Sequence, residues 1–135
     1  MKASLQTGAS ISREVLVDRD RTIGFMGESA RVYATPMLVG DIEMTCRDLL
    51  LQHLDEGEDS VGTRVEIDHL AATLLGMTVS IEARISAVEG RAVSFEVSAT
   101  DGVDTICRCR HNRFVVDVKT TEARLLAKAR KAGLG

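Results

Sequence analysis

Two side chains that can move protons stand where the surrounding pattern predicts inward-facing apolar residues. Residues 61–69 (VGTRVEIDH) alternate with period two, which is typical of a strand. The odd positions, which end at His69, are expected to face inward, and the even positions, including Gly62, are expected to face outward. Residues 36–54 predict a helix, and Glu43 lies on its apolar side. An imidazole or a carboxylate on such a face is costly unless it is paired or belongs to a site.

Each candidate also has a structural explanation that the sequence leaves open. Glu43 is four residues before Arg47, so the two can form an ion pair along the helix. A histidine at the end of a strand can be a satisfied core or rim residue, which would account for His69. Thr35 directly precedes Pro36 and can serve as the N-cap of the predicted helix. If Glu43 instead faces a site cavity, desolvation would tune its basicity.

The run CRCRHNR (107–113) places Cys107, Cys109 and His111 on one face of a strand, which invites a metal site. Distance argues against it, because the first and last of these are ~13 Å apart along an extended strand, whereas zinc ligands lie about 2.3 Å or less from the ion. Cys46 is in mid-helix among apolar side chains, which disfavours a reactive thiolate. We therefore expect neither a metal nor a cofactor.

The elements that must position these residues follow from periodicity and turn signals. Strands are predicted at 12–18, 61–69, 77–88, 91–100 and 103–118. The stretches VEGR and TDGV are short connections containing glycine, so the long strands flanking them are expected to pair antiparallel. One strand, one helix and then four strands is an α+β pattern. A short basic helix is expected within 120–133, as a solvated or interface element.

The predicted helix is apolar around most of its circumference, which indicates a buried helix rather than a surface one. A curved antiparallel sheet wrapped around this central helix, the hotdog arrangement, accounts for both features. Such a five-stranded sheet leaves its edges open, so an oligomer is expected. One narrow polar stripe is expected to face solvent or a partner, and it consists of Asp41, Thr45, Asp48 and Gln52.

Composition limits the class of protein. The chain has 135 residues, 44% hydrophobic and 27% charged, and we expect a single domain over 1–135. A net charge of −3, no Trp and 3% aromatic residues argue against nucleic-acid binding. No apolar run is long enough to cross a membrane, and the N-terminal residues lack an apolar signal core. Three cysteines without CxxC spacing favour the reducing cytoplasm.

From about residue 12 to 118 the chain resembles the hotdog-fold acyl-CoA thioesterases, and among them the fluoroacetyl-CoA thioesterase-like proteins. The similarity is densest in MLVGDIEMTC, in LDEGEDSVGTRVEIDHLAATLLGMTV, in VEGRAVSFEVSATDGVD and in HNR. The spaced combination of Thr, Glu, Gly, His and a final His-x-Arg is more specific than any of its members.

This resemblance implies a catalytic threonine, glutamate and histidine, which fall on Thr35, Glu43 and His69. It implies substrate contacts from Gly62 and Arg113. It also implies a homodimer, with the acyl-CoA substrate near the subunit interface. Hydrolysis of the thioester would use Glu43 either as general base on water or as a nucleophile that forms an anhydride; the sequence does not separate the two.

One departure from the family concerns the segment GFMGESARVYAT (24–35), which is shorter than the phenylalanine-rich lid of the fluoroacetyl-specific enzyme. Its bulky members are Phe25, Met26 and Tyr33, so a different small or medium acyl group is expected. The main alternative function is a hotdog protein that binds acyl-CoA or another apolar ligand without turnover. A hydratase or dehydratase of the same fold fits less well, because EIDHLAATLLG resembles the thioesterase version.

Overall fold

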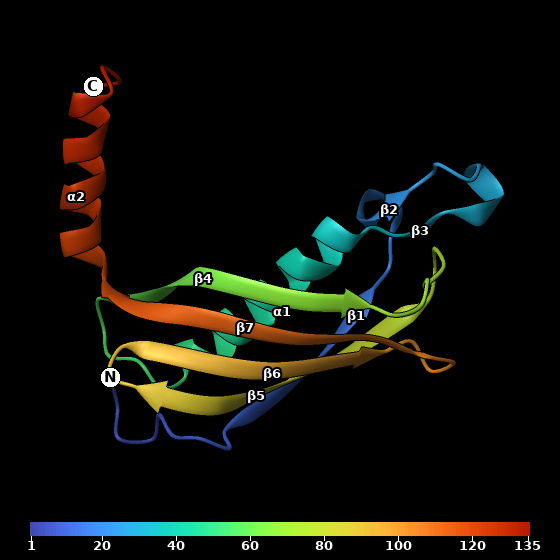
Figure 1. The fold of residues 1–135 in the computed structure, drawn as a ribbon, viewed down its shortest axis with the longest axis horizontal. Coiled ribbons are helices and arrows are strands. Elements are labelled where there is room, and N and C mark those ends of the chain that lie inside the picture. Colours follow the sequence, from blue (N-terminus) through green and yellow to red (C-terminus); the bar gives the residue numbers. More distant parts are fainter.

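The computed structural model describes residues 1–135 and contains a five-stranded antiparallel sheet with helix α1 across one face (Figure 1). The strand order is β1-β5-β6-β7-β4, so β1 and β4 are the free edges. The strands are β1 (Ser10–Leu16), β4 (Glu58–His69), β5 (Thr78–Glu89), β6 (Ala92–Thr100) and β7 (Thr105–Asp117). The predicted α+β class and strand order along the chain are confirmed, with boundaries that differ by at most three residues.

Helix α1 (Thr35–Leu51) is the central helix that the sequence predicts. Pro36 lies in its first turn, where the missing N–H would be unpaired in any case. The N-cap is Ala34, whose side chain makes no capping hydrogen bond. The predicted capping role of Thr35 is therefore wrong, because the helix begins one residue earlier and the threonine belongs to its first turn. The helix also ends three residues before the predicted residue 54.

The core lies between α1 and the inner face of the sheet. It is one cluster of 22 buried hydrophobic residues. The predicted alternation along β5 is confirmed from Val79 to Ile85, where the inward positions are fully buried and their neighbours are more exposed. A register shift between Ile85 and Ala87 interrupts it beyond that point. The helix contributes Leu38, Ile42, Cys46, Leu49 and Leu50, and β5 contributes Val79, Ile81, Ala83 and Ile85.

Strand β4 contains an irregularity that the period-two pattern does not predict. Gly62 pairs with Arg113 of β7 and Arg64 pairs with Asn112, so Thr63 is an extra residue, a β-bulge. Residues that lie directly opposite one another share a face, so Gly62 is on the inner face with the buried Arg113. The predicted faces of residues 61–63 are therefore wrong, because the bulge shifts the alternation by one residue.

Three of the four residues of the polar stripe of α1 are buried or paired within the chain, so the expectation that the stripe faces solvent or a partner holds only for the exposed Gln52. Asp41 accepts hydrogen bonds from Tyr33 Oη, at 2.5 Å, and from Arg21 Nε, at 2.9 Å. Thr45 is fully buried and its hydroxyl donates to the Asp41 carbonyl oxygen. Asp48 forms an ion pair with an arginine of β1. These contacts attach β1 and the segment before α1 to the helix.

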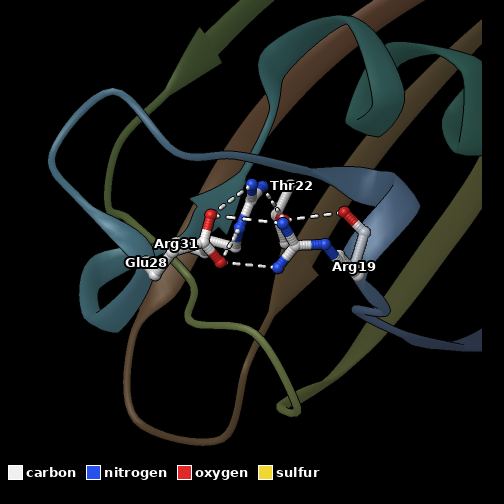
Figure 2. A network of polar contacts seen from close by, with 4 residues as sticks. All are labelled: Arg19, Thr22, Glu28 and Arg31. Atoms are coloured by element: carbon white, nitrogen blue, oxygen red, sulfur yellow. Dashed lines mark hydrogen bonds and ion pairs between the residues drawn. The ribbon is translucent and has the colours of Figure 1, made fainter.

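The segment before α1 is more ordered than the loop that its two glycines suggest. Figure 2 shows the Glu28 carboxylate between two guanidinium groups, with Arg19 Nη1 at 2.6 Å and Arg31 Nη2 at 2.9 Å. These hydrogen bonds lower the pKa of Glu28 to about 2. Arg31 Nη1 also donates to Thr22 Oγ1 (Figure 2). The segment contains the two-residue strands β2 (Thr22–Ile23) and β3 (Val32–Tyr33), which pair antiparallel.

Helix α2 (Val118–Lys131) follows β7 directly and stands away from the sheet (Figure 1). It contains no buried residue, and Leu125 and Leu126 are more than half exposed. Asp117 caps it by accepting a hydrogen bond from the backbone N–H of Thr120. Neither α1 nor α2 is long and apolar enough to cross a membrane.

Candidate active site

Thr35 and His69 lie together at one end of the site. Thr35 is in the first turn of α1 and His69 is the last residue of β4. The Thr35 Oγ1 and His69 Nδ1 atoms are 2.8 Å apart, within hydrogen-bonding distance. The other ring nitrogen, His69 Nε2, is buried and has no hydrogen-bond partner. An unpaired buried nitrogen is costly unless something else approaches it, so this atom is available to a substrate or a water.

Glu43 lies on the side of α1 that faces β4 and β7. Its Oε2 atom is 3.6 Å from Arg113 Nη1, and its side chain remains 34% exposed. The alternative of an ion pair between Glu43 and Arg47 is wrong, because Arg47 instead makes two hydrogen bonds, of 2.7 and 3.0 Å, to Asp59. Glu43 thus has a cation behind it and access to solvent in front, as a reacting carboxylate needs.

Gly62 leaves the space that the Glu43 carboxylate occupies. A Cβ atom added to Gly62 would lie 2.8 Å from Glu43 Oε2, 3.3 Å from His111 Cε1 and 3.5 Å from Arg113 Nη1. No side chain fits there unless the carboxylate moves. The glycine is thus required by the close approach of three side chains, and the bulge is what turns it toward them.

Arg113 is 4% exposed and hydrogen-bonded on three of its nitrogens. Nε donates to Ser60 Oγ at 2.7 Å, Nη2 donates to the Ser60 carbonyl oxygen at 2.9 Å, and Nη1 is 3.1 Å from His111 Nε2. Burial lowers the pKa of Arg113, and the nearby Glu43 opposes that change. The predicted contact between Arg113 and substrate stays a prediction; what the geometry gives is a buried cation beside Glu43.

Sequence reasoning missed two residues of this cluster, Ser60 and His111. His111 was considered as a metal ligand and as part of the final His-x-Arg of the resemblance, but no role in the site was assigned to it, although it and Arg113 are two positions apart on one strand and therefore share a face. That spacing could have placed His111 beside Arg113 from the sequence alone. No comparable pattern pointed to Ser60, because the predicted strand began at residue 61. Cys107 and Cys109 share the inner face with His111, as predicted.

The three buried thiols are poor nucleophiles. Burial raises the pKa of Cys46 and of Cys109 to about 12, and that of Cys107 to about 11. Thiolate is the reactive form, and little of it exists at neutral pH with such values. No group of three or more histidine, cysteine or acidic side chains is arranged to hold a metal ion. Glu43 and His69 stay the candidate residues for chemistry.

The predicted residues form two clusters within the chain, one with Thr35 and His69 and the other with Glu43, Gly62 and Arg113. His69 is seven residues beyond Gly62 on β4, which is roughly 20 Å once the bulge is discounted, at ~3.3 Å per residue. No hydrogen bond joins the clusters. A single chain therefore has two separate clusters of candidate residues on one side of the sheet, which are called half-sites below.

One surface hollow lies away from these residues. Its volume is about 750 Å³, and it is on the outer face of the sheet, lined by charged residues such as Glu82, Arg84 and Arg108. It contains none of the five predicted site residues. Geometry and hydrogen bonding, rather than surface shape, locate the candidate site on the inner face.

Gly62→Ala is expected to displace the Glu43 carboxylate while changing the free energy of unfolding by no more than about 1 kcal/mol, because the clashing atom is the end of a flexible side chain. The distance between Glu43 Oε2 and Arg113 Nη1 in a crystal structure of the variant measures this. Gly40→Ala is the control, since its added methyl meets open space in α1. An unmoved Glu43 in Gly62→Ala would contradict the packing described here.

Comparisons with known proteins show which family the chain resembles in sequence and in fold. Residues 17–119 match the family model described as fluoroacetyl-CoA-specific thioesterase. The fluoroacetyl-CoA thioesterase of Streptantibioticus cattleyicolor is 33% identical over 95% of this chain and 97% of its own length. A crystal structure of a point mutant of the fluoroacetyl-CoA-specific thioesterase has a TM-score of 0.85 and 33% identity, covering 94% of this chain and 99% of the other.

Two further structures extend the comparison. A Thermus thermophilus protein described as a thioesterase superfamily member has a TM-score of 0.85 and 32% identity over 96% of this chain and 98% of its own. A hot-dog-like protein from Thermanaerovibrio acidaminovorans, with a TM-score of 0.83 and 23% identity over 90% of this chain and 91% of its own, supports the fold alone. The predicted hotdog fold is confirmed, and the chain belongs to the fluoroacetyl-CoA-specific thioesterase family.

Proposed function

We propose that Glu43, His69 and Thr35 carry out the hydrolysis of an acyl-CoA thioester to the free acid and CoA. Membership of the family makes the chain an acyl-CoA thioesterase. The observation that supports the residue assignment is the pairing of a carboxylate held beside a buried guanidinium with a histidine whose Nε2 is buried and unpaired. A buried nitrogen without a partner costs stability, so the unpaired Nε2 of His69 supports a role in binding or catalysis.

The chemistry requires an activated nucleophile and stabilisation of the oxyanion that forms on the thioester carbonyl. Glu43 either removes a proton from the attacking water or attacks the carbonyl carbon itself, giving an anhydride that water then opens. His69 polarises the thioester or returns a proton to the departing CoA sulfur. Thr35 holds the His69 ring through Nδ1. Backbone N–H groups near Gly62, or at the start of α1, meet the oxyanion.

A homodimer brings the two half-sites together. Strand β4 is a free edge, and an edge strand pairs readily with an identical strand of another copy. Around a two-fold axis that passes near Glu66, the two β4 strands run antiparallel, and His69 of the partner subunit lies opposite the bulge at 62–63. The Thr35–His69 pair of one subunit then faces Glu43 of the other.

The pairs on either side of the axis suit this register, and the two Glu66 side chains that meet at the axis are each paired with Arg64 of their own strand. On the inner face, Val65 lies opposite Ile67 of the partner subunit, so apolar groups that are half-exposed in one chain cover each other. On the outer face, Arg64 lies opposite Asp68 of the partner subunit, twice by symmetry. Figure 1 shows α2 rising on the side where β4 forms the edge, so a second copy would cover part of this helix and its exposed leucines.

The acyl group proposed is small or medium. The segment before α1 turns between β2 and β3, and at this turn Phe25 is 89% exposed and Met26 is 66% exposed. Tyr33, closer to the helix, is buried in the core. We infer that these two exposed apolar side chains contact a bound substrate and do not form a closed lid over the site. A single domain over residues 1–135 and a cytoplasmic location are also proposed, the latter on the three free cysteines.

Glu43→Gln and His69→Ala are each expected to lower kcat/KM for acyl-CoA hydrolysis at least ~100-fold with the fold intact, because each removes a group that exchanges a proton or stabilises charge in the transition state. The measurement is release of free thiol over acyl-CoAs of graded chain length. Glu96→Gln, on the outer sheet face, and His53→Ala, beside Ser4, are matched controls expected to retain activity. Full activity in both site variants would refute the assignment.

The proposed register predicts the response of the dimer to charge reversal. Arg64→Asp should shift the protein from twice the chain mass of 14.6 kDa toward the monomer, because it faces Asp68 of the partner subunit with a like charge. Combining it with Asp68→Arg should restore the dimer. Sedimentation equilibrium or light scattering provides the masses. A monomeric wild type, or a double variant as dissociated as the single one, would rule out this interface.

A further inference from the structure

We propose that His111 is a positioning residue, which fixes Arg113, and through it the Glu43 carboxylate, by remaining in a single neutral tautomer. The proposal rests on the proposed function of Glu43 and adds a residue that acts only through another. His111 is fully buried on the inner face of β7, and it reaches neither solvent nor the Thr35–His69 pair.

The partners of the ring determine where its proton lies. Nε2 of His111 is 3.1 Å from Arg113 Nη1, and an arginine nitrogen can only donate. Nε2 must therefore be the unprotonated acceptor. Nδ1 is 2.8 Å from the Arg64 carbonyl oxygen, which can only accept, so Nδ1 has the proton. Both bonds are satisfied by the neutral Nδ1–H tautomer and by no other state of the ring.

The surroundings keep the ring in this state. Phe95 of β6 stacks on His111, with ring centroids 6.1 Å apart. Burial lowers the pKa of His111 and the positive charge of Arg113 adds to this, while the bond to the Arg64 carbonyl oxygen and the Glu43 carboxylate oppose it, with a net lowering. The charged groups that face it are Arg113 from its own strand and Glu43 from α1; from β4, the Arg64 carbonyl oxygen is its hydrogen-bond partner. The accepting carbonyl belongs to Arg64, at the bulge, where the regular ladder is interrupted.

The bond from His111 holds the Nη1 end of the Arg113 guanidinium. Ser60 occupies Nε and one hydrogen of Nη2, and His111 occupies one hydrogen of Nη1. Nη1 is also the nitrogen nearest the Glu43 carboxylate, 3.6 Å from Oε2. Without an acceptor at His111 Nε2, Nη1 loses one of its two partners, and only the two Ser60 bonds hold the guanidinium beside the carboxylate. A small shift of such a supporting group lowers the rate more than binding.

Two amide substitutions separate the two hydrogen bonds of the ring. His111→Gln can place its side-chain oxygen where Nε2 was and so keeps the acceptor for Arg113. His111→Asn can donate to the Arg64 carbonyl oxygen, as Nδ1 does, but has nothing at the Nε2 position. His111→Asn should lower kcat by about 10- to 100-fold with KM within about threefold, whereas His111→Gln should stay within about threefold of wild type in both. A purely structural role would make the two variants similar.

Two readouts need no substrate and so separate this proposal from the proposed function. In wild type, ¹⁵N NMR should show His111 protonated at Nδ1 and unprotonated at Nε2 at pH 7; the opposite tautomer or an imidazolium would overturn the proposal. In crystal structures, Arg113 Nη1 should move away from Glu43 Oε2 in His111→Asn and stay in His111→Gln; an unmoved Arg113 in His111→Asn would overturn it. A wild type that hydrolyses no acyl-CoA would instead refute the proposed function.

Discussion

The structure depends on how it accommodates a buried guanidinium. Arg113 lies on the inner face of β7, where an unpaired charge would cost several kcal/mol. Its partners come from three elements: Ser60 from β4, His111 from β7 and Glu43 from α1. Each partner limits where its own helix or strand can lie relative to Arg113. Pairing this one cation therefore helps to set the distance between α1 and the two strands that face it. Glu43 receives its position from that arrangement, not from a neighbour on its own helix.

The bulge in β4 makes this arrangement possible. It turns Gly62 inward, where the absence of a side chain admits the Glu43 carboxylate, and it leaves the Arg64 carbonyl oxygen free to accept from His111. The same strand ends at His69, whose Nε2 has no partner in one chain. Strand β4 thus contributes to both half-sites and is also a free edge. In the proposed dimer, pairing of two β4 strands would complete the site and cover the edge in one step.

Much of the fold follows from sequence patterns, because burial of one face enforces a period of two on the strands and about 3.6 on the helix. The inward position of His69 and the position of Glu43 on the side of α1 that faces the sheet were predictable on those grounds. The bulge in β4 was not predictable, because the sequence pattern does not mark the extra residue and only the pairing with β7 reveals it. The partner of Glu43 was also missed, because Arg47 is the arginine nearest in sequence but is paired with Asp59, and Glu43 lies beside Arg113. Both the bulge and this ion pair depend on residues far apart in the sequence.

The central claim is a thioesterase site shared by two subunits, and complementation tests it most directly. Glu43→Gln and His69→Ala proteins, each inactive alone, are mixed in equal amounts under conditions that allow subunits to exchange. Half of the dimers are then mixed, and each has one site with both native residues, so about a quarter of the wild-type thioesterase activity should return. No recovery, in a mixture shown by mass spectrometry to contain the mixed dimer, would contradict the shared site.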